Sequence, residues 1–318
     1  MEIKKLDEDK CKNLKDLFIE WHERHEEDVN ELRIEVNKLK EREYSCPSPR
    51  KLTKLLKEFG IPGCFSEWFI KDVDMGNVPK AENWEYVLEN AFNLDGGKKN
   101  FEPEPGDYQN IFLFKEANDS DKISSNSKDS YPCFASELEK GNVNPWIYEW
   151  KDKTFKSGIP RKLPKALSKY LTGTTQDEIH NNFLKYAAYM NINKRGGESR
   201  TDERTLLNYA YYYRNYILKE IELLGGEQKH IKVFVCGSRY YFENLIKNLG
   251  LGFNAKDIQH AKYCFINITH PSARIGADKL FEEMNMEEVF GARLKKEIPF
   301  VWINLFTIKF LFEKDKTT

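Results

Sequence analysis

Hydrophobic positions near the start of the chain recur at helical spacing. Between residues 14 and 39 they alternate three and four places apart, which predicts a long amphipathic helix or a helical hairpin. The positions are Leu14, Phe18, Trp21, His25, Val29, Leu32, Val36 and Leu39. Such a stripe can pack within the chain or form a dimer seam. His25 and the charged residues beside it interrupt the seam, so packing within the chain, and a monomer, are favoured.

Two shorter helices are predicted after the helix-breaking stretch SCPSPRK, over residues 49–63 and 81–94. Beyond about residue 105 the pattern changes, and short apolar runs alternate with helical stretches. The runs, which we interpret as four buried strands, are NIFLF (110–114), FLKYAAYM (183–190), IKVFVC (231–236) and KYCFINI (262–268). The helical stretches cover residues 202–224, 240–249 and 276–297.

Strands that alternate with helices are typical of a mostly parallel sheet with helices on both faces. The sequence therefore predicts an α/β fold of three layers, α/β/α, around a four-stranded, mostly parallel central sheet. We assign residues 106–318 to this α/β domain. Residues 1–105 form an N-terminal helical extension.

The overall charge says little about partners, because 50 basic and 51 acidic residues leave a formal net charge of −1. A polyanion must then be bound by a local basic patch. One candidate patch lies between positions 151 and 170, where the only acidic residue is Asp152. Its basic members are Lys151, Lys153, Lys156, Arg161, Lys162, Lys165 and Lys169.

The chain gives no sign of membrane insertion or secretion. Its N-terminus is too charged for a secretory signal, and the longest apolar run, 298–312, is short and contains Asn304 and Lys309. None of the cysteines forms a CxxC pair, which favours reduced thiols over a zinc site. We expect a cytoplasmic protein with no membrane partner.

Polar residues follow each predicted strand, at the sheet edge where parallel sheets bind their ligands. The four ends carry, in chain order, Lys115 to Asp119, Asn191 to Arg195, Gly237 with Ser238, and His270 with Ser272 and Arg274. Each residue alone has an ordinary explanation, such as solvation or the capping of a turn. Together, the carboxylate of Glu116, the amide of Asn191 and the imidazole of His270 indicate a functional site.

These stretches resemble the motifs of the uracil-DNA glycosylase superfamily. THPSAR (269–274) is similar to the HPS-type loop after the fourth strand, and AAYMNINKRGG, the helix that follows it and IKVFVCG are similar to the Asn-bearing stretch of the thermophilic branch. FLFKEAN resembles the Glu-containing first motif, and PCFAS the segment whose Phe stacks on the target base. The resemblance covers roughly residues 108–298. It implies a monofunctional DNA glycosylase that flips a nucleotide, hydrolyses its N-glycosidic bond and leaves an abasic site.

The resemblance also implies roles for individual residues. His270 would donate a hydrogen bond to the leaving base, Glu116 would activate water, and Asn191 would read the polar edge of the base. Asp119 and Asn118 are alternatives to Glu116. The predicted base pocket consists of Phe134, Asn118 and Asp119. The predicted contacts to DNA, whether double-stranded with a flipped base or single-stranded, are Ser272, Arg274, Lys194, Arg195, Lys162 and Lys165.

The sequence departs from the family in ways that change the expected chemistry. Where the thermophilic branch has iron–sulfur cysteines, this chain has Arg195 and LLNYAYYY, so neither a metal nor another cofactor is expected. The water-activating Asp of the best-known uracil enzymes falls at Ala117, and the Tyr that blocks the pyrimidine 5-position falls at Asp119. Room for a 5-substituent and the helical extension together favour a larger base, a hydroxymethylated or glucosylated cytosine of phage DNA, and hence an antiviral role.

Three alternatives stay open at this point. The first is excision of uracil in DNA repair, which the family resemblance alone implies. The second is a catalytically silent DNA-binding protein of the same fold, because the first motif is eroded. The third is an interaction protein that acts through its amphipathic N-terminal helix.

Overall fold

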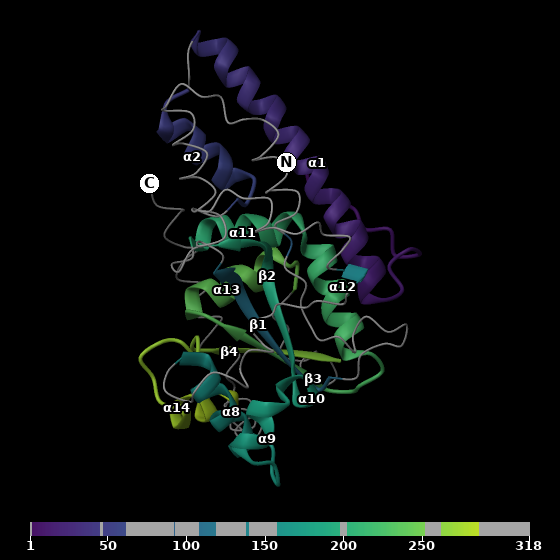
Figure 1. Ribbon diagram of the computed structural model, residues 1–318, viewed down its shortest axis with the longest axis vertical. Coiled ribbons are helices and arrows are strands. Elements are labelled where there is room, and N and C mark those ends of the chain that lie inside the picture. The colour runs from purple at the N-terminus through teal and green to yellow at the C-terminus, as the bar shows by residue number, and fades with distance from the viewer. Residues whose placement is uncertain are drawn as a thin grey trace, which may run out of the picture.

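The computed structural model describes residues 2–44, 47–61, 92, 108–118, 138–139, 158–197, 202–251 and 262–285. Within these ranges four strands form one sheet in the order β2-β1-β3-β4, and every neighbouring pair is parallel. The strands are β1 (Asn110–Asn118), β2 (Ala188–Gly197), β3 (Ile231–Cys236) and β4 (Tyr263–Ile268). Figure 1 shows the sheet in the middle of the molecule with helices on either side. The predicted α/β fold is confirmed.

Both faces of the sheet are apolar, because successive side chains of a strand point to opposite sides. Ile111 and Leu113 of β1 belong to one buried core, whereas Phe112 and Phe114 belong to the other. The first core includes side chains of α1 (Leu14–Glu43), α11 (Glu203–Tyr212), α12 (Arg214–Gly225) and α13 (Arg239–Asn248). The second includes side chains of α8 (Gly158–Tyr170), α9 (Gln176–Asn181), α10 (Phe183–Tyr186) and α14 (Ala277–Met284).

The helix α1 shares a core with the sheet. Leu14, Leu17, Phe18 and Trp21 are buried in the same cluster as Ile111 and Leu113 of β1. The Trp21 ring lies 5.4 Å from that of Tyr216 in α12 and 6.0 Å from that of Tyr213, which lies between α11 and α12. The stripe predicted from the sequence therefore packs within the chain, as favoured.

Two predicted elements differ from the structure. The run 183–190 was predicted as one strand, but its first half is the helix α10, and β2 begins only at Ala188. A short apolar run has no periodicity that separates a strand from a buried helical turn, and Phe183 is buried against the Phe112 ring from within the helix. The helix predicted over 202–224 is divided at Tyr213, where φ is −100° and ψ is 20°.

Other predicted helices are seen in part. The helix α2 (Pro49–Glu58) ends earlier than the predicted range 49–63, and α14 covers the first half of 276–297. Residues 286–297 lie outside the described residues, as does the helix predicted over 81–94 apart from Phe92. No helix in the described part of the chain has the length and apolar character needed to cross a membrane.

The strand order places a topological switch point between β1 and β3. These strands are neighbours in the sheet, yet α8, α9 and α10, which precede β2, lie on one face, and α13, which follows β3, lies on the other. Where chain segments leave adjacent strand ends toward opposite faces, a crevice opens at the carboxyl edge, and open parallel sheets bind their ligands there. A ligand site is therefore expected near the carboxyl ends of β1 and β3.

We expect Trp21→Ala to lower the free energy of unfolding by about 3–5 kcal/mol, because it removes a fully buried ring from the core that α1 shares with the sheet. Urea unfolding followed by circular dichroism measures the change. The matched control on the same helix is Ile34→Ala: Ile34 is 53% exposed, and the expected change is below about 0.5 kcal/mol. Equal, small effects of both substitutions would show that α1 is not part of the core.

Candidate functional site

The loop after β4 is held by two helices. Glu283 of α14 accepts hydrogen bonds from the backbone N–H of Thr269 at 2.6 Å and from its hydroxyl at 2.9 Å. Lys162 of α8 donates to the carbonyl oxygen of Ala273. Within the loop, the N–H of Ala273 donates to the carbonyl of His270 at 2.8 Å, which closes a turn. The imidazole of His270 is therefore carried on a segment fixed at both ends.

The hydrogen bonds of His270 determine which ring nitrogen carries the proton. The backbone N–H of Ser272 points at Nδ1 at 3.2 Å, and the Ser272 hydroxyl lies 2.6 Å from the same atom. A backbone N–H can only donate, so Nδ1 accepts, and the proton of the neutral ring sits on Nε2. Burial, followed by the positive charges of Lys115 and Lys162, lowers the pKa of His270 from 6.5 to about 4. At neutral pH the site thus contains an uncharged imidazole with an N–H donor.

Phe114 links His270 to the second strand. The His270 ring meets the Phe114 ring edge-on at 5.5 Å, and Phe114 stacks on Tyr189 of β2 at 4.4 Å. Asn191 lies opposite Phe114 in the ladder and is completely buried. Strand alternation places Asn191 on the same face of the sheet as Tyr189. The structure thus brings two of the three predicted catalytic residues, His270 and Asn191, to the neighbourhood of Phe114.

The other predicted catalytic and base-binding residues are described less fully. Glu116 and Asn118 belong to β1 and pair with Asn193 and Gly197 of β2, so the strand continues beyond the end predicted from the sequence. Their side chains lie outside the described part of the structure. Asp119 and Phe134 lie outside the described residues altogether.

Lys115 occupies the opposite face of the sheet at the same strand end. Its ammonium nitrogen lies 3.0 Å from a carboxylate oxygen of Glu203 on α11 and 5.0 Å from the centre of the Tyr241 ring on α13. Gly237 is what allows Tyr241 to lie there, since a Cβ at that position would come within 2.5 Å of the ring. Lys115 was noted from the sequence as a strand-end residue but given no role. The signal was a lysine placed directly after the buried run NIFLF.

The prediction that Lys194 and Arg195 contact DNA is wrong, because both side chains are buried, with exposed fractions of 0% and 1%. β2 does not end before them. Between Glu116 and Asn118 on β1, the paired residues on β2 advance from Asn193 to Gly197, so β2 carries extra residues in a bulge. The bulge includes Lys194 and Arg195, and both side chains point into the core that α1 and α12 share with the sheet.

Both buried cations are paired with carboxylates. Lys194 forms an ion pair with Glu220 of α12 at 2.6 Å and donates to the carbonyl oxygen of Asn191 at 2.8 Å. Arg195 donates to Asp28 of α1 at 2.8 Å and to the carbonyl oxygen of Phe59 at 3.0 Å. These residues hold the strand in place rather than meeting a ligand at the surface.

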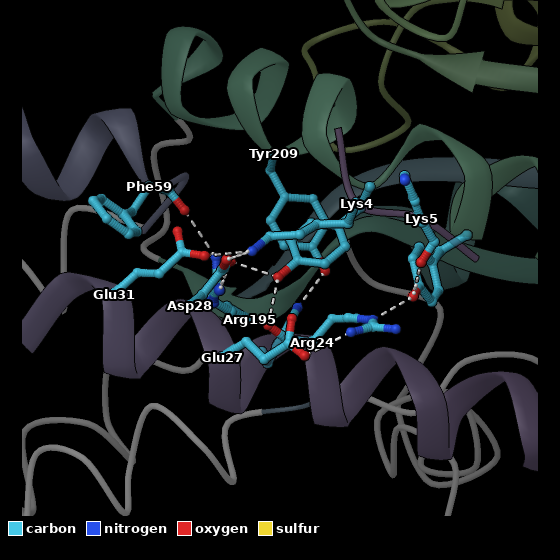
Figure 2. A network of polar contacts seen from close by, with 12 residues as sticks. Lys4, Lys5, Arg24, Glu27, Asp28, Glu31, Phe59, Arg195 and Tyr209 are labelled. Carbon is cyan, nitrogen blue, oxygen red and sulfur yellow. Dashed lines mark hydrogen bonds and ion pairs between the residues drawn. The ribbon is translucent and has the colours of Figure 1, made fainter. Parts of the chain in front are cut away.

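Asp28 is the centre of a larger polar network, drawn in Figure 2. Besides Arg195 it accepts a hydrogen bond from the hydroxyl of Tyr213 at 2.5 Å and forms an ion pair with Lys4 at 3.0 Å. His25, one turn earlier on α1, shares a hydrogen bond of 2.8 Å with the Tyr209 hydroxyl. Burial, followed by the charge of Arg195, lowers the pKa of His25 far below its usual value. The network joins the N-terminal segment, α1, β2 and α11.

The remaining predicted DNA contacts border the His270 loop. Ser272 and Arg274 are exposed on the loop, and Lys165 is exposed on α8. Lys162 is partly buried by its bond to the loop. In the basic patch, Arg161 is also exposed, whereas Lys169 pairs with Asp278 of α14. Lys151, Lys153 and Lys156 lie outside the described residues.

Neither the protein-family models nor the curated proteins compared with the chain gave a match. The likeness to uracil-DNA glycosylases therefore rests on the motif residues alone. Among the described residues, no three His, Cys, Asp or Glu side chains gather in a way that would hold a metal ion.

We expect Arg195→Met and Asp28→Asn each to lower the free energy of unfolding by about 3–5 kcal/mol, because each leaves a buried charge without its partner. Chemical denaturation measures both. The control is Arg239→Met, which breaks an exposed ion pair with Glu243 and should change stability by less than about 1 kcal/mol. If Arg195→Met instead weakened DNA binding and left stability unchanged, Arg195 would be a surface contact after all.

We expect the His270 ring to stay neutral down to about pH 4 and to carry its proton on Nε2. Proton–nitrogen NMR of the imidazole tests both points, and a pKa above 6 or an Nδ1-bound proton would contradict them. The folded pKa lies below the unfolded value, so between pH 6.5 and about 4 the unfolded chain binds more protons. The free energy of unfolding should therefore fall as pH falls through this window, and His270→Gln should make that fall shallower.

Proposed function

We propose that the protein is a monofunctional DNA glycosylase, which removes a base from DNA and leaves an abasic site. The observation that carries the proposal is the hydrogen bonding of His270. Its Nδ1 is occupied by the backbone of its own loop, so the neutral ring presents Nε2–H as a donor. It does so at the carboxyl edge of a parallel sheet, beside the switch point, where such folds bind ligands.

A neutral donor of this kind suits a reaction in which negative charge develops on the leaving group. When the N-glycosidic bond breaks, its electron pair departs with the base, and the charge spreads onto the base oxygens. A fixed N–H aimed at such an oxygen lowers the barrier, typically by about 3–4 kcal/mol. Lys115 and Lys162 add positive charge around the ring, which keeps it neutral and favours an anionic leaving group.

The remaining steps of the hydrolysis are assigned to β1 and β2. The sugar becomes cationic as the base leaves, and a water oxygen then forms the new bond to its anomeric carbon. In this proposal Glu116 accepts a proton from that water and offsets the sugar charge, and the departed base anion is finally protonated from solvent. Asn191 reads the base through its amide, which offers both a donor and an acceptor.

The exposed residues around the loop suit the DNA backbone. Ser272 and Arg274 lie beside His270, and Arg161 and Lys165 lie on the neighbouring helix α8. Cationic and hydroxyl side chains are the usual partners of phosphate oxygens. DNA binding through this patch is expected to weaken as salt is raised.

For the base we propose a 5-modified cytosine, hydroxymethylated or glucosylated, as carried by phage DNA, which makes the protein an antiviral enzyme. The support is the resemblance, in which Asp119 takes the place of a blocking Tyr. A pocket with a polar group that hydrogen-bonds the sugar substituent would reject a smaller base, because a smaller base leaves that polar group unpaired. The helix α1, in contrast, packs in the core with α12 and gives no support for an enlarged base pocket.

The substrate is tested by incubating purified protein with three DNAs: unmodified, uracil-containing and glucosyl-hydroxymethylcytosine DNA. Cleavage of abasic sites by alkali reports base release. We expect strand breaks only with the glucosylated DNA. Release of uracil with none from the modified DNA would overturn the substrate, and no release from any of the three would leave a silent DNA-binding protein.

We expect His270→Ala and Glu116→Gln each to lower single-turnover base release by at least about a hundredfold, with DNA affinity retained. The two groups act at different points of one transition state, so the loss of either should lower the rate of base release and leave DNA affinity unchanged. Lys219→Met, which removes a lysine on α12 that pairs with Glu222, serves as the control and should leave the rate unchanged. Unchanged release in both site variants would refute the assignment of the site.

A further inference from the structure

Lys115 is the one lysine of β1, and it lies beside the switch point between β1 and β3. Its neighbours Ile111 and Leu113 face the core that includes α11 and α13, and Lys115 contacts these same helices through Glu203 and Tyr241. His270, in contrast, packs on Phe114 on the other side of β1. The pairing of β1 with β3 ends at Leu113 and Val235, so a ligand beside β1 beyond that pair would have the imidazole on one side and the ammonium group on the other.

The surroundings of Lys115 hold the ammonium group in place without exhausting its bonding capacity. A lysine ammonium has three donor hydrogens, and Glu203 accepts one of them at 3.0 Å. The Tyr241 ring covers a further side at 5.0 Å. The side chain is 19% exposed, so the charge is largely shielded from bulk water yet open to a bound group. Electrostatic attraction is stronger in such surroundings than in water.

We propose that Lys115 and His270 form a two-sided receptor for an anionic oxygen of the bound nucleotide, with Glu203 as the counter-ion of Lys115 in the empty site. The receptor rests on the proposed function in one respect, namely that the anion belongs to a nucleotide. The oxygen belongs either to the departing base or to a phosphate beside the flipped nucleotide. Both present the same chemistry to a cation and a neutral N–H donor.

Because Lys115 pairs with Glu203, substitutions of these two residues should change the affinity for an anion in opposite directions. Loss of the cation removes one charge-assisted hydrogen bond to the anion. Loss of the carboxylate leaves the ammonium group unneutralised, which strengthens its attraction for an anion. A residue with a purely structural role would not respond in opposite directions, since both substitutions break the same ion pair.

The first experiment needs no enzymatic activity. Inorganic phosphate is titrated into the purified protein at pH 7.5, and the NMR signals of the His270 imidazole report binding. We expect Lys115→Met to weaken the affinity about tenfold or more and Glu203→Gln to strengthen it about threefold, with Lys115→Arg close to wild type. Lys57→Met is the matched control, because Lys57 forms an ion pair with Asp202, the residue next to Glu203.

The same samples give a second readout. The pKa of His270 should rise in Lys115→Met, because a positive charge that opposes protonation is gone, and should not move in Lys57→Met. Circular dichroism confirms that each variant is folded. A folded Lys115→Met with wild-type phosphate affinity, or a Glu203→Gln that binds phosphate more weakly, would overturn the receptor.

Base release and DNA affinity then identify the source of the oxygen. If Lys115 meets the departing base, Lys115→Met lowers the single-turnover rate and leaves affinity for DNA with an abasic analogue unchanged. If it meets a phosphate, affinity for that DNA falls and its salt dependence becomes shallower. A variant that changes neither would overturn the receptor. Failure of the glycosylase proposal itself would appear separately, as wild-type protein that binds phosphate but releases no base.

Discussion

The buried ion pair between Arg195 and Asp28 is the contact on which the arrangement of the sheet edge depends. A guanidinium taken out of water costs several kcal/mol unless a carboxylate and further acceptors receive it, and here α1 supplies Asp28 and the residue after α2, Phe59, supplies its carbonyl oxygen. Tyr213 and Lys4 satisfy the rest of the carboxylate. A helix distant in sequence thus sets the course of an edge strand.

That course reaches the candidate site through the next residue. Lys194 is anchored by Glu220 on α12, and its ammonium group also binds the carbonyl oxygen of Asn191. The backbone that carries Asn191 is therefore tied to the core on the side away from His270. In the proposed site, the amide of Asn191 is thus carried on a fixed backbone.

On the His270 side of β1, burial and charge together set the chemistry. His270 has no carboxylate among the groups that shift its pKa; its charged neighbours there are Lys115 and Lys162. A histidine in such surroundings makes a poor general base, because the protonated form is opposed by burial and by both cations. It makes a good hydrogen-bond donor for an anion, because the loop backbone already occupies Nδ1. Two independent features of the loop thus favour the same role.

The sequence predicted much of this fold because the relevant signals are local. Apolar runs such as IKVFVC and the helical stripe of α1 are read directly from spacing, and so are the ends of β3 and β4. His270 and Ser272 were found because they follow β4 within a few residues. Asn191, predicted to follow the second strand, instead lies inside β2, opposite Phe114 of β1.

The misread charged residues share one physical cause, since each depends on a partner far away in the sequence. In the sequence, Lys194 and Arg195 look like a solvated basic loop. In the structure, α12 supplies Glu220 to Lys194, and α1 supplies Asp28, 167 residues away, to Arg195. Lys115 looks like a surface residue until Glu203 and Tyr241 close over it. Charge alone does not separate a lysine at the surface from one that is buried and paired, because the difference lies in tertiary contacts.

In the proposed reaction, different residues stabilise the leaving base and discriminate between bases. His270 and Lys115 respond to negative charge on an oxygen, a property that every departing pyrimidine shares whatever its 5-substituent. The α1 helix, which the sequence offered as a possible wall for a larger base, instead fills the core beside α12. In this proposal, discrimination between bases is left to side chains at and beyond the end of β1, where Asn118 and Asp119 lie in the sequence. Chemistry and specificity would then evolve separately, the first on the fixed loop and strand, the second on the segment that follows them.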